Sequence, residues 1–191
     1  MKGIYAGMAI GLGAIAYMST GGFISAILFS IGLLAVLYFG LDLYTGKVCY
    51  IKNYSPKLLL ILIENFIGAG FMALLAYTHS QWIDAAQLAC NIKAGKTWVE
   101  LLVDGIICGM CIGIAVHGFN QENRNFFIVI LAITVFIMSG AEHVIADAFY
   151  IILGQNLTWM QIANILGFSL IGNTIGGLFI YCFSLKGGNK R

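Results

Sequence analysis

The chain of 191 residues has little charge: 9% of its residues are Asp, Glu, Lys or Arg, whereas 60% are hydrophobic. Soluble domains carry roughly 25% charged residues, so the composition excludes an ordinary water-soluble globule and a disordered chain. Ten basic against eight acidic residues leave no cationic excess to neutralise phosphates, which excludes nucleic acid as a partner. At ~20 residues a span, this length accommodates about six membrane spans with short loops.

Signals for metal, redox or enzyme chemistry are also scarce. The five cysteines lie in apolar runs, and the one C-x-x-C pair, Cys108 and Cys111, has no second pair or nearby histidine to complete a zinc site. We interpret both as packing residues of a helix. No nucleophile with its base, cofactor loop or metal set is visible, so the sequence predicts neither an enzyme nor a bound cofactor. The apolar N-terminal segment has no small-residue cleavage site, so no cleavable signal peptide is expected.

What the sequence does contain is a series of apolar runs, which predict an all-α membrane protein with six transmembrane helices. Two of the runs carry a polar interruption, at Gly40–Gly46 and around Ser139–His143. Gln81–Lys96 is more polar and is predicted to be a surface loop with a short helix, and Asn120–Asn125 a polar loop. The six spans are Gly3–Thr20, Phe23–Tyr50, Pro56–Thr78, Thr97–Phe119, Phe126–Leu153 and Thr158–Phe183.

Basic residues are distributed unevenly between the two sides of this topology. Six spans place both termini on one side, and only Lys93 and Lys96 fall on the other. Because basic loops favour the cytoplasm, both termini are predicted to be cytoplasmic. The basic residues on the side of the termini are Lys2, Lys47, Lys52, Lys57, Arg124, Lys186, Lys190 and Arg191.

Features of the first three spans recur in the same order in the last three. Both middle spans are interrupted at an acid, Asp42 or Glu142, and the other shared features are Gly-x-x-x-Gly and Asn-x-x-Gly motifs. Three spans per half reverse the direction of entry, so residues 1–79 and 93–191 are predicted to form a 3+3 inverted repeat. Interrupted helices at matching positions point to a transport site near the midplane. The motifs are Gly7/Gly11, Gly105/Gly109, Asn65/Gly68 and Asn173/Gly176.

Polar residues at the two interruptions are the first candidates for function, because polar groups at membrane depth are costly. His143 can donate, accept or hold a proton near neutral pH. Thr45, in the opposite interruption, offers a hydroxyl or caps the following helix. We expect Asp42 and Glu142 to be structural anchors that accept N–H bonds from unwound backbone. Glu100 and Asp104 lie near the outer end of their span and are expected to pair with Lys93 or Lys96.

Three stretches give the chain a family resemblance: Phe29–Gly46, Ser139–Phe149 and Ile171–Gly177. With the Glu-His pair and the Leu-Tyr-Thr loop, the chain resembles the formate/nitrite transporter family. The resemblance implies an aquaporin-like fold and a homopentamer with one pore per subunit, in the inner membrane of a prokaryote. It implies small monovalent anions as substrates: formate, nitrite, hydrosulfide, or a short carboxylate such as acetate or lactate.

The resemblance also assigns roles to individual residues. It makes His143 the pore histidine, Lys93 the vestibule lysine and Asn173 a structural asparagine. It places constrictions at both ends of the pore. The residues that it assigns to the constrictions are Leu43, Tyr44 and Thr45 on the cytoplasmic side, Ile112 and Phe136 on the outer side, and Phe29 and Leu33, which precede the loop on the second span.

Three positions depart from the family pattern. Ala141 replaces a bulky aromatic residue, and Gly109 stands where a pore-facing asparagine is expected, which would widen the pore near the histidine. Asp147 stands where the family has an asparagine and adds a carboxyl that can share a proton with its neighbours. We expect Asp147 to act as a structural polar residue beside His143.

A passage between apolar constrictions would strip water from an anion at a large cost, which protonation of the anion removes. We therefore predict a channel or transporter with proton-linked passage of the anion, with Lys93, Thr45 and His143 as the binding residues. The other class considered is a non-transporting assembly or sensor subunit. A water channel of the glycerol-channel type is disfavoured, because both of its Asn-Pro-Ala loops are missing.

Overall fold

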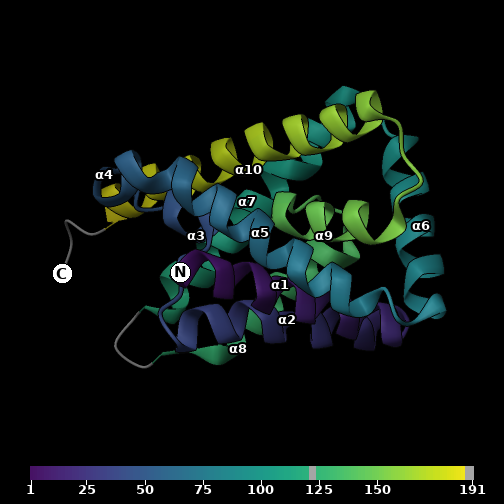
Figure 1. Cartoon of the computed structure of the whole chain (residues 1–191). Helices are drawn as coiled ribbons and strands as arrows, with labels where there is room; N and C mark the ends of the chain where they lie inside the picture. The colour runs from purple at the N-terminus through teal and green to yellow at the C-terminus, as the bar shows by residue number, and fades with distance from the viewer. Residues whose placement is uncertain (121–123, 188–191) are drawn as a thin grey trace.

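A computed structural model describes residues 1–120 and 124–187 of the chain, and every secondary-structure element in this part is a helix (Figure 1). The predicted loop Asn120–Asn125 lies partly outside the described residues, as do Lys190, Arg191 and the side chain of Lys186. The helices are α1 (Lys2–Ser19), α2 (Gly22–Tyr38), α3 (Tyr44–Val48), α4 (Ile51–Tyr54), η1 (Ser55–Lys57), α5 (Leu58–Ala76), α6 (Ser80–Ala94), α7 (Trp98–Phe119), α8 (Phe126–Met138), α9 (Val144–Gly154) and α10 (Trp159–Gly187).

These helices confirm the predicted order of spans. Three segments are long and apolar enough to cross a membrane, namely Ile51–Ala76, Trp98–Phe119 and Trp159–Phe183. The two interrupted spans are the pairs α2 with α3 and α8 with α9. A capping box fixes the start of α7, because the Thr97 hydroxyl accepts from the Glu100 N–H and the Glu100 carboxylate accepts from the Thr97 N–H.

Two predicted boundaries are wrong. The first interruption is shorter than Gly40–Gly46, because α3 already begins at Tyr44. The segment 81–96 is mostly helix: α6 is 15 residues long and packs against α9. In Figure 1, α6 lies across one end of the bundle, while α1 begins and α10 ends at the other.

Glycines allow two helix pairs to approach closely, α1 with α5 and α7 with α10. A Cβ at Gly68 would clash with the Ile4 carbonyl, and one at Gly7 would clash with the Asn65 carbonyl. The second pair repeats this contact at Gly176 and Gly109. Small residues bring backbones together where lipid supplies no hydrophobic drive. The matching crossings support the inverted repeat.

Gly68→Ala is expected to destabilise the protein by about 1–3 kcal/mol, because the added methyl group meets backbone that cannot move aside. Thermal unfolding in detergent would measure the loss. Gly167→Ala in α10 is the matched control, since nothing lies within 4 Å of its Cβ position. Equal unfolding midpoints for the two variants would show that the α1–α5 crossing does not depend on a glycine.

Candidate functional site

The two interruptions have the same backbone structure at residue numbers that differ by 100. Gly40 and Gly140 both have left-handed backbone, with φ of 61° and 71°, which favours glycine. The residue after each glycine donates its N–H back into the preceding helix, Leu41 to the Val36 carbonyl at 2.9 Å and Ala141 to the Phe136 carbonyl at 3.1 Å. Two equivalent breaks therefore face the middle of the bundle.

Asn65 of α5 holds the first break. Its Oδ1 accepts the Tyr44 N–H at 2.8 Å, and its Nδ2 donates to the carbonyls of Gly3 and Asp42, each at 2.8 Å. The residue is fully buried. The side chain thus satisfies the Tyr44 N–H and the Asp42 carbonyl, which the break leaves unpaired, and connects them to the Gly3 carbonyl of α1.

Asn173 of α10 repeats this arrangement at the second break. Its Oδ1 accepts the Val144 N–H at 3.0 Å, and its Nδ2 donates to the carbonyls of Gly105 and Glu142 at 2.9 and 2.7 Å. This geometry gives Asn173 the contacts of a structural residue. The equivalent role of Asn65 was missed, although the repeated Asn-x-x-Gly motif carried the signal.

His143 and Thr45 join the two breaks, with Nε2 and Oγ1 3.0 Å apart and both residues buried. The other ring nitrogen, Nδ1, accepts the Ala146 N–H at 3.3 Å. A backbone N–H can only donate, so Nδ1 carries no proton and the neutral ring is protonated at Nε2. The Nε2–H therefore donates to the Thr45 hydroxyl, which leaves that hydroxyl free to donate in turn.

One cavity of about 150 Å³ reaches His143; we call it the Lys93 cavity. Phe29 and Phe136 lie in its wall, with ring centroids 5.7 Å apart in an edge-to-face arrangement. The polar residues of its wall include Lys93, His143 and Asp147. A cation and an imidazole thus share a small cavity with aromatic walls.

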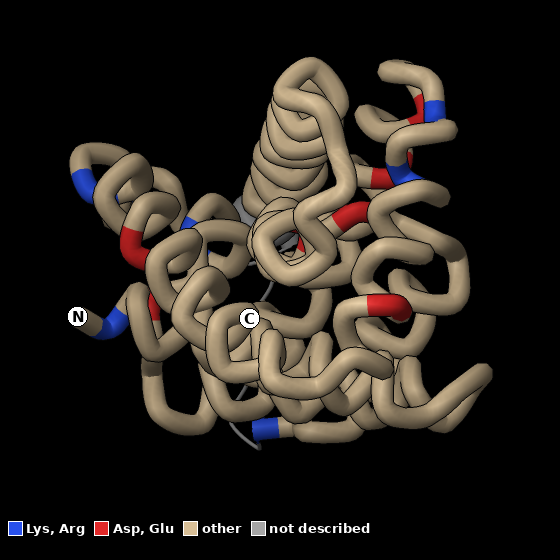
Figure 2. The backbone as a smooth tube through the Cα atoms, turned by 45° about the vertical axis from the view of Figure 1, so that its right-hand side comes forward, with Lys and Arg blue, Asp and Glu red and all other residues tan. Residues whose placement is uncertain are grey.

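Five charged side chains form what we call the charge cluster: Lys93, Lys96, Asp104, Glu142 and Asp147. Lys93 pairs with Glu142 and lies 2.9 Å from Asp147 Oδ1. Lys96 lies 2.8 Å from Glu142 and 2.6 Å from Asp104, so the predicted pairing of Asp104 is confirmed. Glu100 bonds to Thr97 instead. Charged residues are few along the backbone as a whole, and segments of opposite charge lie close together on one side of it (Figure 2).

The expected role of the two break acids is wrong in its detail. Glu142 contacts two lysines through its side chain, and Asp42 lies 3.0 Å from Lys47. The bonds that hold the breaks go to the main-chain carbonyls of these acids, from Asn65 and Asn173. The acids neutralise cations, and the asparagines anchor the backbone.

A second cavity, of about 270 Å³, lies on the other side of the breaks and includes Leu33, Leu43 and Lys47 in its wall. We call it the Lys47 cavity. Lys47 Nζ donates to the Tyr54 hydroxyl at 3.2 Å besides its pair with Asp42. In the sequence, Lys47 served only to predict which side of the membrane the termini face, although its spacing from Asp42 could have indicated the ion pair of these two residues.

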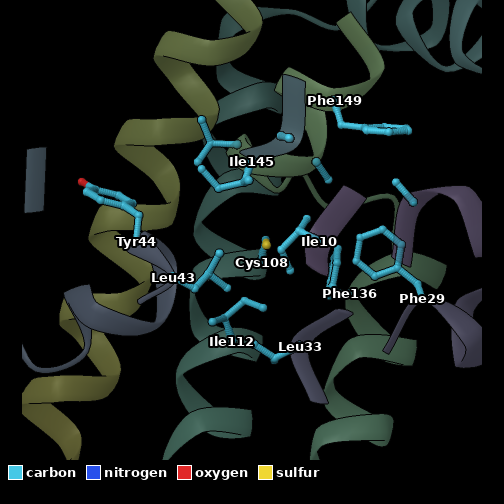
Figure 3. Close-up of a cluster of buried hydrophobic side chains, with 14 of the residues drawn as sticks. Ile10, Phe29, Leu33, Leu43, Tyr44, Cys108, Ile112, Phe136, Ile145 and Phe149 are labelled. Atoms are coloured by element: carbon cyan, nitrogen blue, oxygen red, sulfur yellow. The ribbon is translucent and has the colours of Figure 1, made fainter. Parts of the chain in front are cut away.

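The residues predicted for the constrictions divide into three groups. Phe29 and Phe136 line the Lys93 cavity, and Leu33 and Leu43 line the Lys47 cavity. Ile112 lies beside Leu33 and Leu43 within the apolar cluster (Figure 3). The described apolar side chains thus separate the two cavities.

The structure places Tyr44 differently from its predicted role. Its hydroxyl points away from Leu43 (Figure 3) and lies 3.0 Å from Thr174 Oγ1 of α10. The side chains of successive residues at the start of a helix point in different directions, so Leu43 and Tyr44 do not share a face. Tyr44 contacts α10 and lines neither cavity.

Of the three departures from the family pattern, one was misjudged. A Cβ at Gly109 would meet the backbone of Asn173, so this position faces α10 and does not widen a cavity. Ala141 and Asp147 do line the Lys93 cavity. Cys108 and Cys111 are free buried thiols, and the described residues contain no cluster of three metal-ligating side chains.

Three features define the class of this protein: two pairs of half-helices, breaks held by asparagine side chains, and helix pairs that approach closely at glycines. It is a helical membrane protein with an inverted repeat and a polar site between its broken helices. Within this class, the chain belongs to the formate/nitrite transporter family, whose model matches residues 1–185.

Curated relatives and solved structures agree with this assignment. The formate channel FocA of Haemophilus influenzae is 25% identical over 189 residues, covering 81% of this chain and 65% of the relative. The formate channel BtFdhC of Bacillus thuringiensis is 26% identical over 171 residues, covering 78% and 66%. This chain thus spans about two thirds of the length of these relatives.

The fold is also similar to that of a pentameric formate channel solved with formate bound. The TM-score is 0.88 at 20% identity, with 100% of this chain and 96% of that one covered. An ion channel of the same family gives a TM-score of 0.83 at 21% identity, with coverages of 97% and 88%. These likenesses establish the fold.

Proposed function

We propose that the chain is a channel for small monovalent anions of weak acids, of the formate or nitrite type. The observation that carries the proposal is the His143–Thr45 contact, in which the imidazole N–H donates to a hydroxyl that is left free to donate, between two cavities separated by apolar side chains. A small anion accepts hydrogen bonds from such donors. Relatives that are formate channels support this substrate class.

Passage is proposed to be proton-linked. A bare anion among Phe29, Phe136 and Leu33 loses its water without a full set of replacement bonds, whereas the neutral acid does not carry that cost. Lys93 attracts the anion into its cavity, and His143 and Thr45 bind it while it becomes neutral. Hydrosulfide, acetate and lactate are the alternative substrates on the same chemistry.

The setting of the channel is part of the proposal. Large apolar side chains cover the outer surface of α5, including Leu60, Ile67 and Leu74, as expected of a face in contact with lipid or a second copy. We assign the assembly as a homopentamer in the inner membrane of a prokaryote with both termini cytoplasmic. The outward side of the Lys93 cavity then faces the cell exterior.

Flux into proteoliposomes tests the proposal directly. Purified protein is expected to carry labelled formate, and unlabelled nitrite, hydrosulfide and acetate are compared as competitors in the same assay. The competitor that is effective at the lowest concentration identifies the preferred anion. Flux equal to that of empty liposomes for all four would support the non-transporting subunit instead.

His143→Phe is expected to lower formate flux about tenfold to a hundredfold, because loss of one hydrogen bond to a charged group costs roughly 1.5–3 kcal/mol. The pH profile of this variant separates binding by the ring from proton supply, since loss of a hydrogen bond alone lowers flux at every pH. His79→Phe is the matched control, since His79 is exposed and lines neither cavity. An unchanged rate and pH profile in His143→Phe would remove the histidine from the mechanism.

A further inference from the structure

The charge cluster contains one more acid than it has bases. Lys93 and Lys96 supply two positive charges, whereas Asp104, Glu142 and Asp147 supply three negative ones. Glu142 and Asp147 are each 1% exposed in their side chains, and both contact the ammonium group of Lys93. A buried, unbalanced charge is costly, and binding one proton removes it.

The inverted repeat locates the excess acid at one position. In the first break, Asp42 lies 3.0 Å from Lys47, which makes one closed ion pair. The residues with the same places in the second break are Glu142 and Asp147. The second break therefore has an acid, Asp147, at the position where the first break has a base, Lys47. The cations that neutralise the acids of the second break, Lys93 and Lys96, lie outside that break.

Asp147 is the member of the cluster best placed to hold this proton. Glu142 uses both oxygens, Oε2 on Lys93 and Oε1 on Lys96. Asp147 Oδ1 forms an ion pair with Lys93 at 2.9 Å, but both of its carboxylate oxygens are buried without a hydrogen-bond partner within the described part of the chain, and Oδ2 has no ion pair there either. The side chain lines the Lys93 cavity together with His143. Protonation of Oδ2 would turn an unsatisfied acceptor into a donor in the cavity.

His143 is less suited to give up a proton. Its Nδ1 accepts the Ala146 N–H, so a second proton has no place there without breaking that bond. Its single proton, on Nε2, is engaged with Thr45. The ring is thus held neutral with its N–H directed at Thr45, and proton supply needs another group.

We propose that Asp147 is the proton donor of this channel. It holds one proton, and the negative charge of Glu142, which contacts the same lysine, makes the loss of that proton costly. The inference rests on the proposed anion transport. In the step, the Oδ2–H bond of Asp147 breaks, its electron pair stays on the carboxylate, and an O–H bond forms on the anion. The neutral acid moves on, and a proton from water entering the Lys93 cavity restores Asp147.

The surroundings of Asp147 favour this assignment from each side. Lys93 is the cation in contact with it, and Glu142 is the acid nearest that cation. Of the described residues that line the cavity, none comes from α5 or α10, which also pack against α9. The remaining titratable groups around it are Tyr17 of α1, Cys90 of α6, Cys108 of α7, His143 of the break and Tyr150 of α9.

Infrared spectroscopy of the reconstituted protein tests the proton directly. A protonated carboxylic acid has a carbonyl stretching band separate from that of a carboxylate, and wild type is expected to show one such band at neutral pH. The band should disappear in Asp147→Asn, which keeps the shape of the side chain. Asp42→Asn, in the matching break, should keep the band because Asp42 is already paired one to one.

Isotope labelling keeps the test independent of folding of the variants. In wild type, ¹³C-labelled aspartate should shift the band, and ¹³C-labelled glutamate should not. A band shifted by labelled glutamate, or no band at any pH between 5 and 8, would overturn the proposal.

Flux supplies the second readout. Wild-type formate flux should rise on acidification and then level off once Asp147 is protonated. Asp147→Asn should lose this plateau and carry formate roughly tenfold more slowly at the pH where wild type levels off, since water replaces a positioned acid poorly. If wild type and Asp147→Asn had the same dependence of formate flux on pH, the assignment of Asp147 as the proton donor would be overturned. Absence of flux in wild type would instead defeat the proposed transport, whatever the infrared result.

Discussion

Replacing Asn173 by alanine is expected to destabilise the protein by at least about 2 kcal/mol. The side chain satisfies two main-chain groups of the second break, the Val144 N–H and the Glu142 carbonyl, and also donates to the Gly105 carbonyl of α7. Each buried group left without a partner costs about 1–3 kcal/mol. Because His143 lies in this break, formate flux should also be lost. Unfolding in detergent, followed by circular dichroism, measures the first effect.

Two further variants sharpen this prediction. Asn65→Ala should be as damaging as Asn173→Ala, since Asn65 makes the same three bonds at the first break. Asn156→Ala removes an exposed asparagine that bonds to Asn91 and should change stability by less than about 0.5 kcal/mol. If Asn173→Ala and Asn156→Ala had the same unfolding midpoint, the breaks would not depend on their asparagines.

Features with a local physical cause could be predicted from the sequence. Span positions follow from the length of apolar runs, and the second break was placed correctly at Ser139–His143 because Gly140 and the polar residues after it interrupt such a run. The Thr97–Glu100 capping box marks the start of α7 within three residues of sequence. Each of these signals lies within one segment, so no knowledge of packing was needed.

Features that depend on packing could not be predicted. Lys93 and Glu142 are 49 positions apart, and only the docking of α6 against the second break brings them together. The direction of the Tyr44 side chain depends on where α10 passes. Which neighbour Gly109 faces depends on the crossing of α7 and α10. Sequence spacing carries no information on these contacts, which explains why the residue types were found and several partners were not.

The repeat shows how one frame supports two different surfaces. The backbone bonds of the breaks are equivalent, but Leu43 corresponds to His143 and Lys47 to Asp147. The first break therefore presents the apolar side chain of Leu43 and the ion pair of Asp42 with Lys47, whereas the second presents the imidazole of His143 and a further acid, Asp147. Symmetry of the fold thus sets where polar groups can be buried, and the asymmetry of these side chains gives the passage its chemistry.

Replacing Lys93 by methionine is expected to destabilise the protein by about 3–5 kcal/mol, because removing one partner leaves buried charge uncompensated. Lys93 lies on α6, which is not one of the spans, and its side chain is 13% exposed. Burial alone would lower the pKa of Lys93, but the charges of Asp147 and Glu142 outweigh that effect and raise it. The lysine is therefore charged at neutral pH, and its contribution is lost only as the pH rises through this raised value.

Acidification and a second substitution separate this loss of charge from a loss of packing. In Lys93→Met, lowering the pH neutralises the Glu142 carboxylate, which has lost one of its two lysines, so the difference in stability from wild type should narrow between pH 8 and 5. Lys93→Met with Asp147→Asn should recover part of the loss, because it removes the acid that Lys93→Met leaves without a cation. Flux of this double variant at low salt then measures attraction of the anion alone, and a rate equal to that of Asp147→Asn would exclude a steering role for Lys93. A deficit in stability that is independent of pH and not recovered by the second substitution would mean that the aliphatic stem of Lys93, and not its charge, holds α6 to the second break.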